Sequence, residues 1–267
     1  MNLSTLVPKL ARAGSIAAAI LIPLTIAWVV LLIHPSPPPD EASAIERLAF
    51  IEMNEQWQTA SFIVAALMAI VYIPVWIGLG AVIVPVRQTV GMIAVALGVM
   101  FSALLVVGYW TQLATVQNLL QLLETNTNAA IAMAGAFEFS GNFWTASYGI
   151  VIAAFVIWGL TTLTIFSGLI DSAWRPAQLT AAMYGVAGLL ALVGAVGFAA
   201  GISILEHGIM LSGILVVPAL SGTVVMLHQV ASGNDPDLIA PDKQSSDDQN
   251  PPVMTPADAG SGGDGRT

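Results

Sequence analysis

The sequence predicts an all-α fold: a polytopic membrane protein built as a six-transmembrane-helix bundle with a small extracytoplasmic helical cap. Hydrophobic residues make up 57% of the chain and charged residues 9%, whereas soluble domains have roughly 45–50% and 25%. Nearly all charged residues lie between six long apolar stretches or in the polar C-terminal segment. Since a charge at mid-bilayer costs a few kcal/mol or more, a hydrocarbon environment explains these charge-free runs.

Six apolar stretches are each long enough to cross the bilayer core, which takes about 20 helical residues. The predicted spans are 13–33, 59–84, 90–112, 145–168, 178–200 and 207–228. The first follows Lys9 and Arg12 as the apolar part of a signal peptide would. It is longer than the roughly 7–15 residues of such a segment, and no small-residue cleavage site follows it. We therefore expect 13–33 to remain as an uncleaved span.

The distribution of Lys and Arg predicts the orientation of the spans. Arg47 falls on one side of the membrane, and the other basic residues before the C-terminal segment fall on the opposite side. These are Lys9, Arg12, Arg87 and Arg175. Because Lys and Arg concentrate in cytoplasmic connections, we expect a multi-pass protein of the cell (plasma) membrane with both termini in the cytoplasm.

The lengths of the connections predict which helices are neighbours. Three connections are short, at 85–88, 170–176 and 201–207. Short connections force antiparallel packing, so spans 2 and 3, 4 and 5, and 5 and 6 are expected side by side. The two long connections, 34–58 and 113–144, both fall on the external side.

The long connections carry helical patterns that predict the cap. Ser43 and Glu46 fit a capping box, which predicts a helix starting near residue 41 that could run directly into the second span. The third span continues outward to Glu124 on an apolar stripe. The segment 129–139 is apolar but short, which is typical of an interfacial or re-entrant helix.

The C-terminal segment, 231–267, has the composition of a disordered acidic tail. Gly, Pro, Asp, Ser and Gln dominate it, and it carries seven acidic and two basic residues after position 234. Such a segment buries too little apolar surface to offset its ordering entropy. We expect it to be a cytoplasmic tail attached to a six-span domain at 1–230.

Small residues mark the fifth span for close helix packing. Ala187, Ala191 and Ala195 recur every four residues, and Gly197 and Gly201 form a GxxxG pattern. Small side chains let helix backbones approach in lipid, where water exclusion does not drive association. We expect packing within the bundle, with dimerisation as the alternative.

Three prolines lie near the middle of a span and predict helix kinks, at Pro23, Pro74 and Pro218. Each lacks the N–H that would bond the carbonyl four residues earlier. In transporters such broken helices build the binding site. In other membrane proteins, neighbouring groups satisfy the carbonyl. The prolines therefore leave a transport site open as an alternative.

The spans lack the residues that most transport and enzyme chemistry uses. No Asp, Glu, Lys or Arg lies at mid-depth, which argues against a proton-coupled pump. The chain has no cysteine and no GxSxG, HExxH or P-loop motif. It has no basic footprint for nucleic acid either. We therefore predict no catalytic residue, no cofactor, no metal and no nucleic-acid partner.

Polar side chains gather instead at the external face, where they form the candidate ligand-binding set. Its members are Glu52, Glu55, Gln112, Gln117, Gln121, Glu206 and His207. A metal site formed by His34, His207 and these carboxylates is an alternative, since the ligand types suit zinc. The two histidines are 173 positions apart and no spacing motif supports them. The tryptophans near span ends are interpreted as an aromatic belt. They are Trp57, Trp110, Trp144, Trp158 and Trp174.

The arrangement of spans and loops resembles a bacterial family, the six-span proteins grouped as domain of unknown function 4386. The resemblance is carried by the hairpin sequences at 85–91 and 170–176, each with one Arg and one Pro, and by the two long external loops. It covers about residues 10–230. It implies the six-span fold and no assigned activity.

The leading hypothesis is a non-enzymatic membrane scaffold or accessory protein that binds membrane lipid or a protein partner. It rests on the lack of intramembrane charge and of catalytic or cofactor motifs. The alternative is a transporter or small-ligand-binding membrane protein, which the prolines and the polar external face suggest. A membrane-embedded hydrolase that uses Glu52 and Glu55 is the third and least favoured interpretation.

Overall fold

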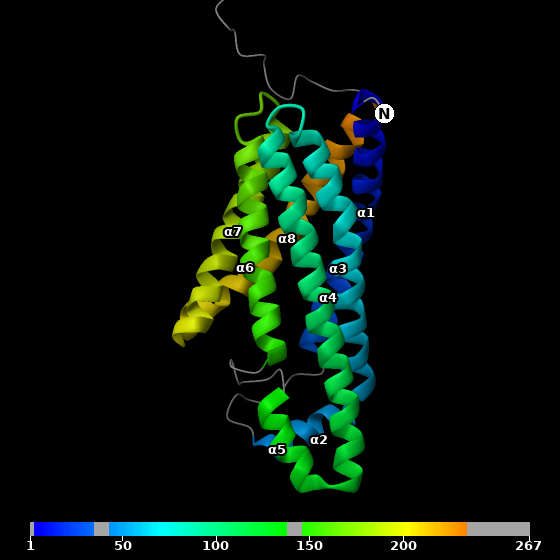
Figure 1. The fold of residues 1–267 in the computed structure, drawn as a ribbon, viewed down its shortest axis with the longest axis vertical. Coiled ribbons are helices and arrows are strands. Elements are labelled where there is room, and N and C mark those ends of the chain that lie inside the picture. Colours follow the sequence, from blue (N-terminus) through cyan, green and yellow to red (C-terminus); the bar gives the residue numbers. More distant parts are fainter. Residues whose placement is uncertain (1–2, 35–42, 138–145, 234–267) are drawn as a thin grey trace, which may run out of the picture.

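The computed structural model describes residues 3–34, 43–137 and 146–233, and these residues form helices and no strand (Figure 1). Within these described ranges, six helices are long and apolar enough to cross a membrane. They are α1 (Leu3–Ile33), α3 (Glu55–Ile83), α4 (Gln88–Thr125), α6 (Ala146–Leu169), α7 (Arg175–Ala200) and α8 (Ser203–Ala231). Two shorter helices, α2 (Ala44–Met53) and α5 (Thr127–Phe137), lie beyond one end of the bundle. The all-helical, six-span fold is therefore as predicted.

The six long helices form a closed ring that follows the order of the sequence. Each packs mainly on two neighbours, in the order α1, α3, α4, α6, α7, α8 and back to α1. The three antiparallel pairs predicted from short connections are among these contacts. The ring closes between its first and last helices, where the Ser15 hydroxyl donates to the Val224 carbonyl at 3.1 Å. We call this arrangement the six-helix ring.

Several helices extend beyond the predicted spans. α1 begins at Leu3 and so contains Lys9 and Arg12, whereas the predicted span begins at 13. α4 continues for 38 residues to Thr125, in agreement with the predicted outward stripe. Hydropathy marks the part of a helix that suits lipid, and polar residues next to it can continue the same helix. Residues 234–267, which include nearly all of the predicted tail, lie outside the described residues.

Glycines bring the backbones of neighbouring helices into contact. A Cβ added to Gly208 of α8 would lie 2.4 Å from the carbonyl oxygen of Leu190 in α7, which is far inside contact distance. The facing Gly194 has the same constraint, with its Cβ position 2.5 Å from the backbone nitrogen of Ile209. Such close approach increases van der Waals contact, the main force that holds helices together in lipid.

The predicted packing residues of α7 divide into two groups. Ala187, Ala191, Ala195 and Gly197 are buried, and the Ser212 hydroxyl of α8 donates to the Ala187 carbonyl at 2.8 Å. Gly201 differs from expectation, because it is exposed at the end of α7 with φ of 66°. There it lets the Ile202 N–H bond the Gly197 carbonyl at 2.9 Å. Gly201 ends the helix and packs against no neighbour.

The cap has a small core of its own beyond the ring. It is formed by α2, α5 and the outer turns of α4, and its buried members are Leu48, Leu119, Ala130 and Ala134. The predicted capping box is present, with the Ser43 N–H donating to Glu46 at 2.7 Å. This hydrogen bond is the main reason why the pKa of Glu46 lies below its ordinary value. α2 ends at Met53, and Asn54 separates it from α3, so the two helices are not continuous.

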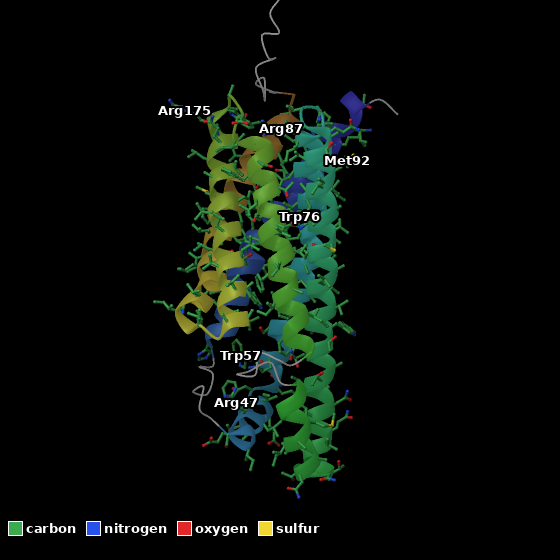
Figure 2. All side chains as sticks on the ribbon, turned by 60° about the vertical axis from the view of Figure 1, so that its left-hand side comes forward. Arg47, Trp57, Trp76, Arg87, Met92 and Arg175 are labelled. Atoms are coloured by element: carbon green, nitrogen blue, oxygen red, sulfur yellow. The ribbon has the colours of Figure 1, made fainter. Side chains whose placement is uncertain are left out.

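The three arginines labelled in Figure 2 lie at opposite ends of the molecule. Arg87 and Arg175 lie at the end where α1 begins and α8 finishes, which we call the arginine end. Arg47 lies in the cap, at the opposite end. This grouping agrees with the sequence pattern that predicted the orientation. The assignment of the arginine end to the cytoplasm remains a prediction.

Candidate functional site: the aromatic interior and the cap

The axis of the six-helix ring is filled by Trp76 of α3, which is fully buried. Its indole stacks on Tyr72, with ring centroids 5.1 Å apart and an interplanar angle of 9°. It also lies 6.2 Å from Phe101 of α4 and 6.3 Å from Tyr184 of α7. α3 and α7 lie on opposite sides of the ring, so the contact between Trp76 and Tyr184 spans the interior of the ring.

A glycine on the neighbouring helix makes room for this indole. A Cβ added to Gly98 of α4 would lie 2.4 Å from Cγ of Trp76. Trp158 of α6 continues the aromatic interior, 6.4 Å from Phe101 and buried. The interpretation of Trp158 as a belt residue is therefore wrong. Trp57 and Trp110, in contrast, are exposed as a belt requires.

Five buried polar atoms have no hydrogen-bond partner within the described part of the chain. Two lie in the middle of the ring, Nε1 of Trp76 and Oγ of Ser102. The other three are Nε1 of Trp28, Oγ1 of Thr59 and Nε2 of Gln112. All five atoms are neutral, and four of them belong to α3 and α4. Burying a polar atom without a partner costs about as much free energy as losing a hydrogen bond. These positions therefore suit a bound polar group.

The predicted external ligand set is dispersed in the structure. Glu52 and Glu55 are exposed, and the Gln117 amide donates to Glu55 Oε1 at 3.0 Å. Gln121 is exposed on the outer part of α4. Gln112 differs from the others, because only 1% of its surface is exposed. The members on α2, α3 and α4 therefore separate into a solvated group near the cap and one buried amide inside the ring.

The described residues of the metal alternative are found in separate places in the structure. His207 is exposed in the first turns of α8. The side chain of Glu206 lies outside the described residues. His34 packs edge-on against Trp57, with centroids 5.6 Å apart. No group of three or more metal-ligating side chains occurs among the residues that the structure describes.

Two of the three prolines face away from the interior. Pro23 and Pro218 are exposed on the outer surface of the ring, where they line no internal path. Pro74 is half-buried, and its carbonyl oxygen lies 3.0 Å from the position that a Cβ on Gly14 would take. Pro74 therefore lies at the close contact between α1 and α3.

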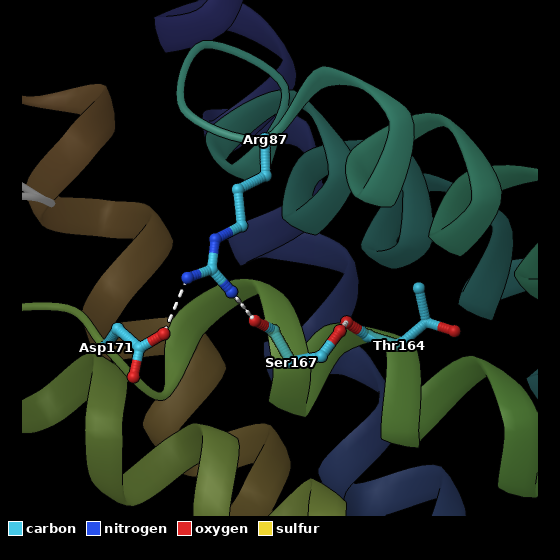
Figure 3. Close-up of polar contacts among 4 residues, drawn as sticks. All are labelled: Arg87, Thr164, Ser167 and Asp171. Carbon is cyan, nitrogen blue, oxygen red and sulfur yellow. Dashed lines mark hydrogen bonds and ion pairs between the residues drawn. The ribbon is translucent and has the colours of Figure 1, made fainter.

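An ion pair at the arginine end joins two hairpins and was not found by sequence reasoning (Figure 3). Nη2 of Arg87 lies 2.6 Å from Oδ2 of Asp171. Nη1 of Arg87 donates to the Ser167 carbonyl. Both charged residues lie in short connections between helices. The sequence pattern used Arg87 only to predict the orientation of the spans. Nothing in the sequence pairs positions that are 84 residues apart.

Comparison with known proteins gives no relative for this arrangement. No family model matches the chain, and neither a curated protein nor a solved structure matches it. The resemblance to the domain of unknown function 4386 family thus remains a prediction from hydropathy and loop placement.

Proposed function

We propose that this protein is a non-enzymatic membrane scaffold or accessory protein that binds membrane lipid or a protein partner. The observation that carries the proposal is the contact of Trp76 with Tyr184 across the ring axis, 6.3 Å between centroids. Large aromatic side chains fill the region where a transporter of this shape would place its substrate. The exposed carboxylates Glu52 and Glu55 lie on the cap, where a partner can reach them.

The cap is the surface that we assign to partner contact. It combines exposed carboxylates, Glu52 and Glu55, with exposed apolar side chains on the adjoining turns. Those apolar residues are Ile45, Met53 and Trp57. In the proposed orientation the arginine end faces the cytoplasm of the plasma membrane and the cap faces outward. Solvated carboxylates on such a cap give no support to the hydrolase alternative.

A second candidate function, transport or binding of a small ligand, is favoured by the unpartnered polar atoms. Nε1 of Trp76 and Oγ of Ser102 lie at mid-depth, where a substrate would pass. Passage would require the Trp76 indole to move away from the axis. The variant Trp76→Ala would then raise solute flux, and a scaffold would show no flux with either residue.

The deciding experiment is gentle extraction of the protein with its native lipid, followed by mass spectrometry of everything that co-purifies. A stoichiometric protein partner that is lost when Ile45 and Met53 are changed to Ser would support the proposal. The matched control, Val86→Ser, changes an exposed apolar residue at the arginine end, away from the cap, and should keep the partner. A retained small solute with no partner protein would overturn the scaffold assignment in favour of transport.

A further inference from the structure

Three polar side chains near the cap end of the ring lie within about one helical turn of one another along the bundle axis. The Tyr109 phenol of α4 lies 6.3 Å from Phe62 of α3 and 6.2 Å from Trp28 of α1, centroid to centroid. Thr59 comes three residues before Phe62, and Gln112 comes three residues after Tyr109. α3 and α4 are antiparallel, so the step from Phe62 to Thr59 and the step from Tyr109 to Gln112 both run toward the cap. Each step covers about one helical turn and stays on the same face of its own helix. Thr59 therefore faces Gln112 one turn outward from the Phe62–Tyr109 contact.

The unpartnered atoms at this level are mainly hydrogen-bond donors. Nε1 of Trp28 and Nε2 of Gln112 donate only, and Oγ1 of Thr59 can donate or accept. No Asp, Glu, Lys or Arg occurs between 56 and 86 or between 88 and 123, so the walls that α3 and α4 contribute are uncharged. An anion would lose its hydration there without a counter-charge. The matching group is a neutral oxygen with free lone pairs.

A carbonyl oxygen fits this set of donors better than a water molecule does. It accepts hydrogen bonds through two lone pairs and carries no hydrogen that needs an acceptor. A water molecule would bring two O–H groups, and only the Thr59 oxygen among these three atoms can accept. Aromatic side chains of Trp28, Phe62 and Tyr109 would enclose the apolar part of the molecule.

The depth of Gln112 indicates which carbonyl is near. Gln112 follows Arg87, at the arginine end, by 25 residues of α4, a rise of about 37 Å at about 1.5 Å per residue. The hydrocarbon core is about 30 Å thick, so Gln112 lies at the boundary between acyl chains and headgroups in the far leaflet. The ester carbonyls of glycerolipids lie at this boundary. Trp28 and Thr59 are half-buried, so part of each side chain reaches the surface although the donor atoms themselves are buried.

We propose that Gln112, Thr59 and Trp28 form a binding site for the acyl ester carbonyl of a glycerolipid, between α1, α3 and α4 beneath the cap. The inference rests on the proposed function in one respect, that the protein binds membrane lipid. It assigns that binding to a defined site inside the ring instead of to the general lipid-facing surface.

The test compares variants that remove one donor each and keep an apolar side chain of similar size. They are Gln112→Leu, Thr59→Val and Trp28→Phe. The matched control is Gln88→Leu, which changes the same residue type on the same helix at an exposed position at the arginine end. Each protein is placed in nanodiscs of phosphatidylethanolamine and phosphatidylglycerol with ¹³C-labelled ester carbonyls. Isotope-edited infrared spectroscopy then measures carbonyl hydrogen bonding, and mass spectrometry counts the lipid retained after detergent exchange.

The wild-type protein and Gln88→Leu are expected to retain a stoichiometric glycerolipid with a carbonyl band shifted to lower frequency. Gln112→Leu should bind it about tenfold more weakly, as expected for one lost hydrogen bond in a buried site. Equal retention in Gln112→Leu, together with a higher melting temperature, would overturn the proposal, since the amide would then be merely unsatisfied. A different retained molecule, or water alone, would also overturn it. A stoichiometric protein partner without retained lipid would overturn this site and leave the proposed function standing.

Discussion

The Asp171 carboxylate lies 2.6 Å from the Arg87 guanidinium, and this ion pair joins the α3–α4 hairpin to the connection between α6 and α7. Arg87 also donates to the Ser167 carbonyl at the end of α6. The guanidinium thus contacts a side chain and a backbone group of the same turn (Figure 3). It therefore links the α3–α4 hairpin to the end of α6 and the connection that follows it.

Removing this ion pair is expected to have a small effect. The side chains of Arg87 and Asp171 are 37% and 65% exposed, so the variant Asp171→Asn should lower the free energy of unfolding by about 0.2–1 kcal/mol. Arg87→Met should cost more, because it also removes the bond to Ser167. Thermal unfolding in detergent at low and high salt measures both, with Arg175→Met as an exposed control. A loss for Asp171→Asn that is unchanged by high salt would contradict the ion-pair explanation.

The Gly208 contact predicts a strong position dependence of alanine substitution within α8. Gly208→Ala places a methyl group 2.4 Å from the Leu190 carbonyl oxygen, and we expect a loss of about 1–3 kcal/mol. Gly213→Ala in the same helix meets nothing within 4 Å. That control should be neutral or slightly stabilising, since alanine favours a helix over glycine. Unfolding in mild detergent checks the pair, and equal stability of the two variants would refute the close approach of α7 and α8.

Truncation of the axial tryptophan is expected to be among the most costly single changes in the ring. Trp76 is fully buried among aromatic side chains, so Trp76→Ala should leave a cavity and lower stability by about 3–5 kcal/mol. The matched control is Trp110→Ala, because Trp110 is 65% exposed on the outside of α4. Its loss should be several-fold smaller. Similar losses at the two positions would mean that Trp76 does not fill the axis.

The capping box predicts a pH-dependent cap helix. The Ser43 N–H bond holds the pKa of Glu46 below its ordinary value, so the carboxylate stabilises the folded state. That stabilisation is fully present above the unfolded pKa and is lost as the pH falls through the lower folded pKa. Amide hydrogen exchange in α2, measured from pH 7 down to pH 3, should show protection that declines at the acidic end. Glu46→Gln should remove this decline, and an identical profile in both proteins would disprove the linkage.

The features that local sequence determines were predicted well. The six spans follow from charge-free apolar runs, and the capping box at Ser43 follows from a pattern only four residues long. The neighbours α3–α4, α6–α7 and α7–α8 follow from short connections, because a chain cannot reach farther. Each of these predictions depends on residues that are close together in sequence.

Features that depend on how each helix is rotated toward its neighbours were predicted poorly. Gln112 was grouped with Gln117 and Gln121 in the external ligand set, but it is buried, whereas Gln121 is exposed. Trp158 lies within the aromatic interior because α4 brings Phe101 toward it. Gly201 matches a packing motif by spacing, but α7 ends there. Hydropathy does not determine helix rotation in lipid, since lipid-facing and buried positions are both apolar.

The contact between α1 and α8 has a consequence for biosynthesis. Ser15 and Val224 are separated by 209 residues, so their hydrogen bond forms only after nearly the whole membrane domain has been made. Until α8 leaves the translocon, Ser15 of α1 lacks its final hydrogen-bond partner. Nascent chains truncated before α8 should therefore insert their earlier helices and still present α1 to quality-control proteases, which makes the last helix the step that completes maturation.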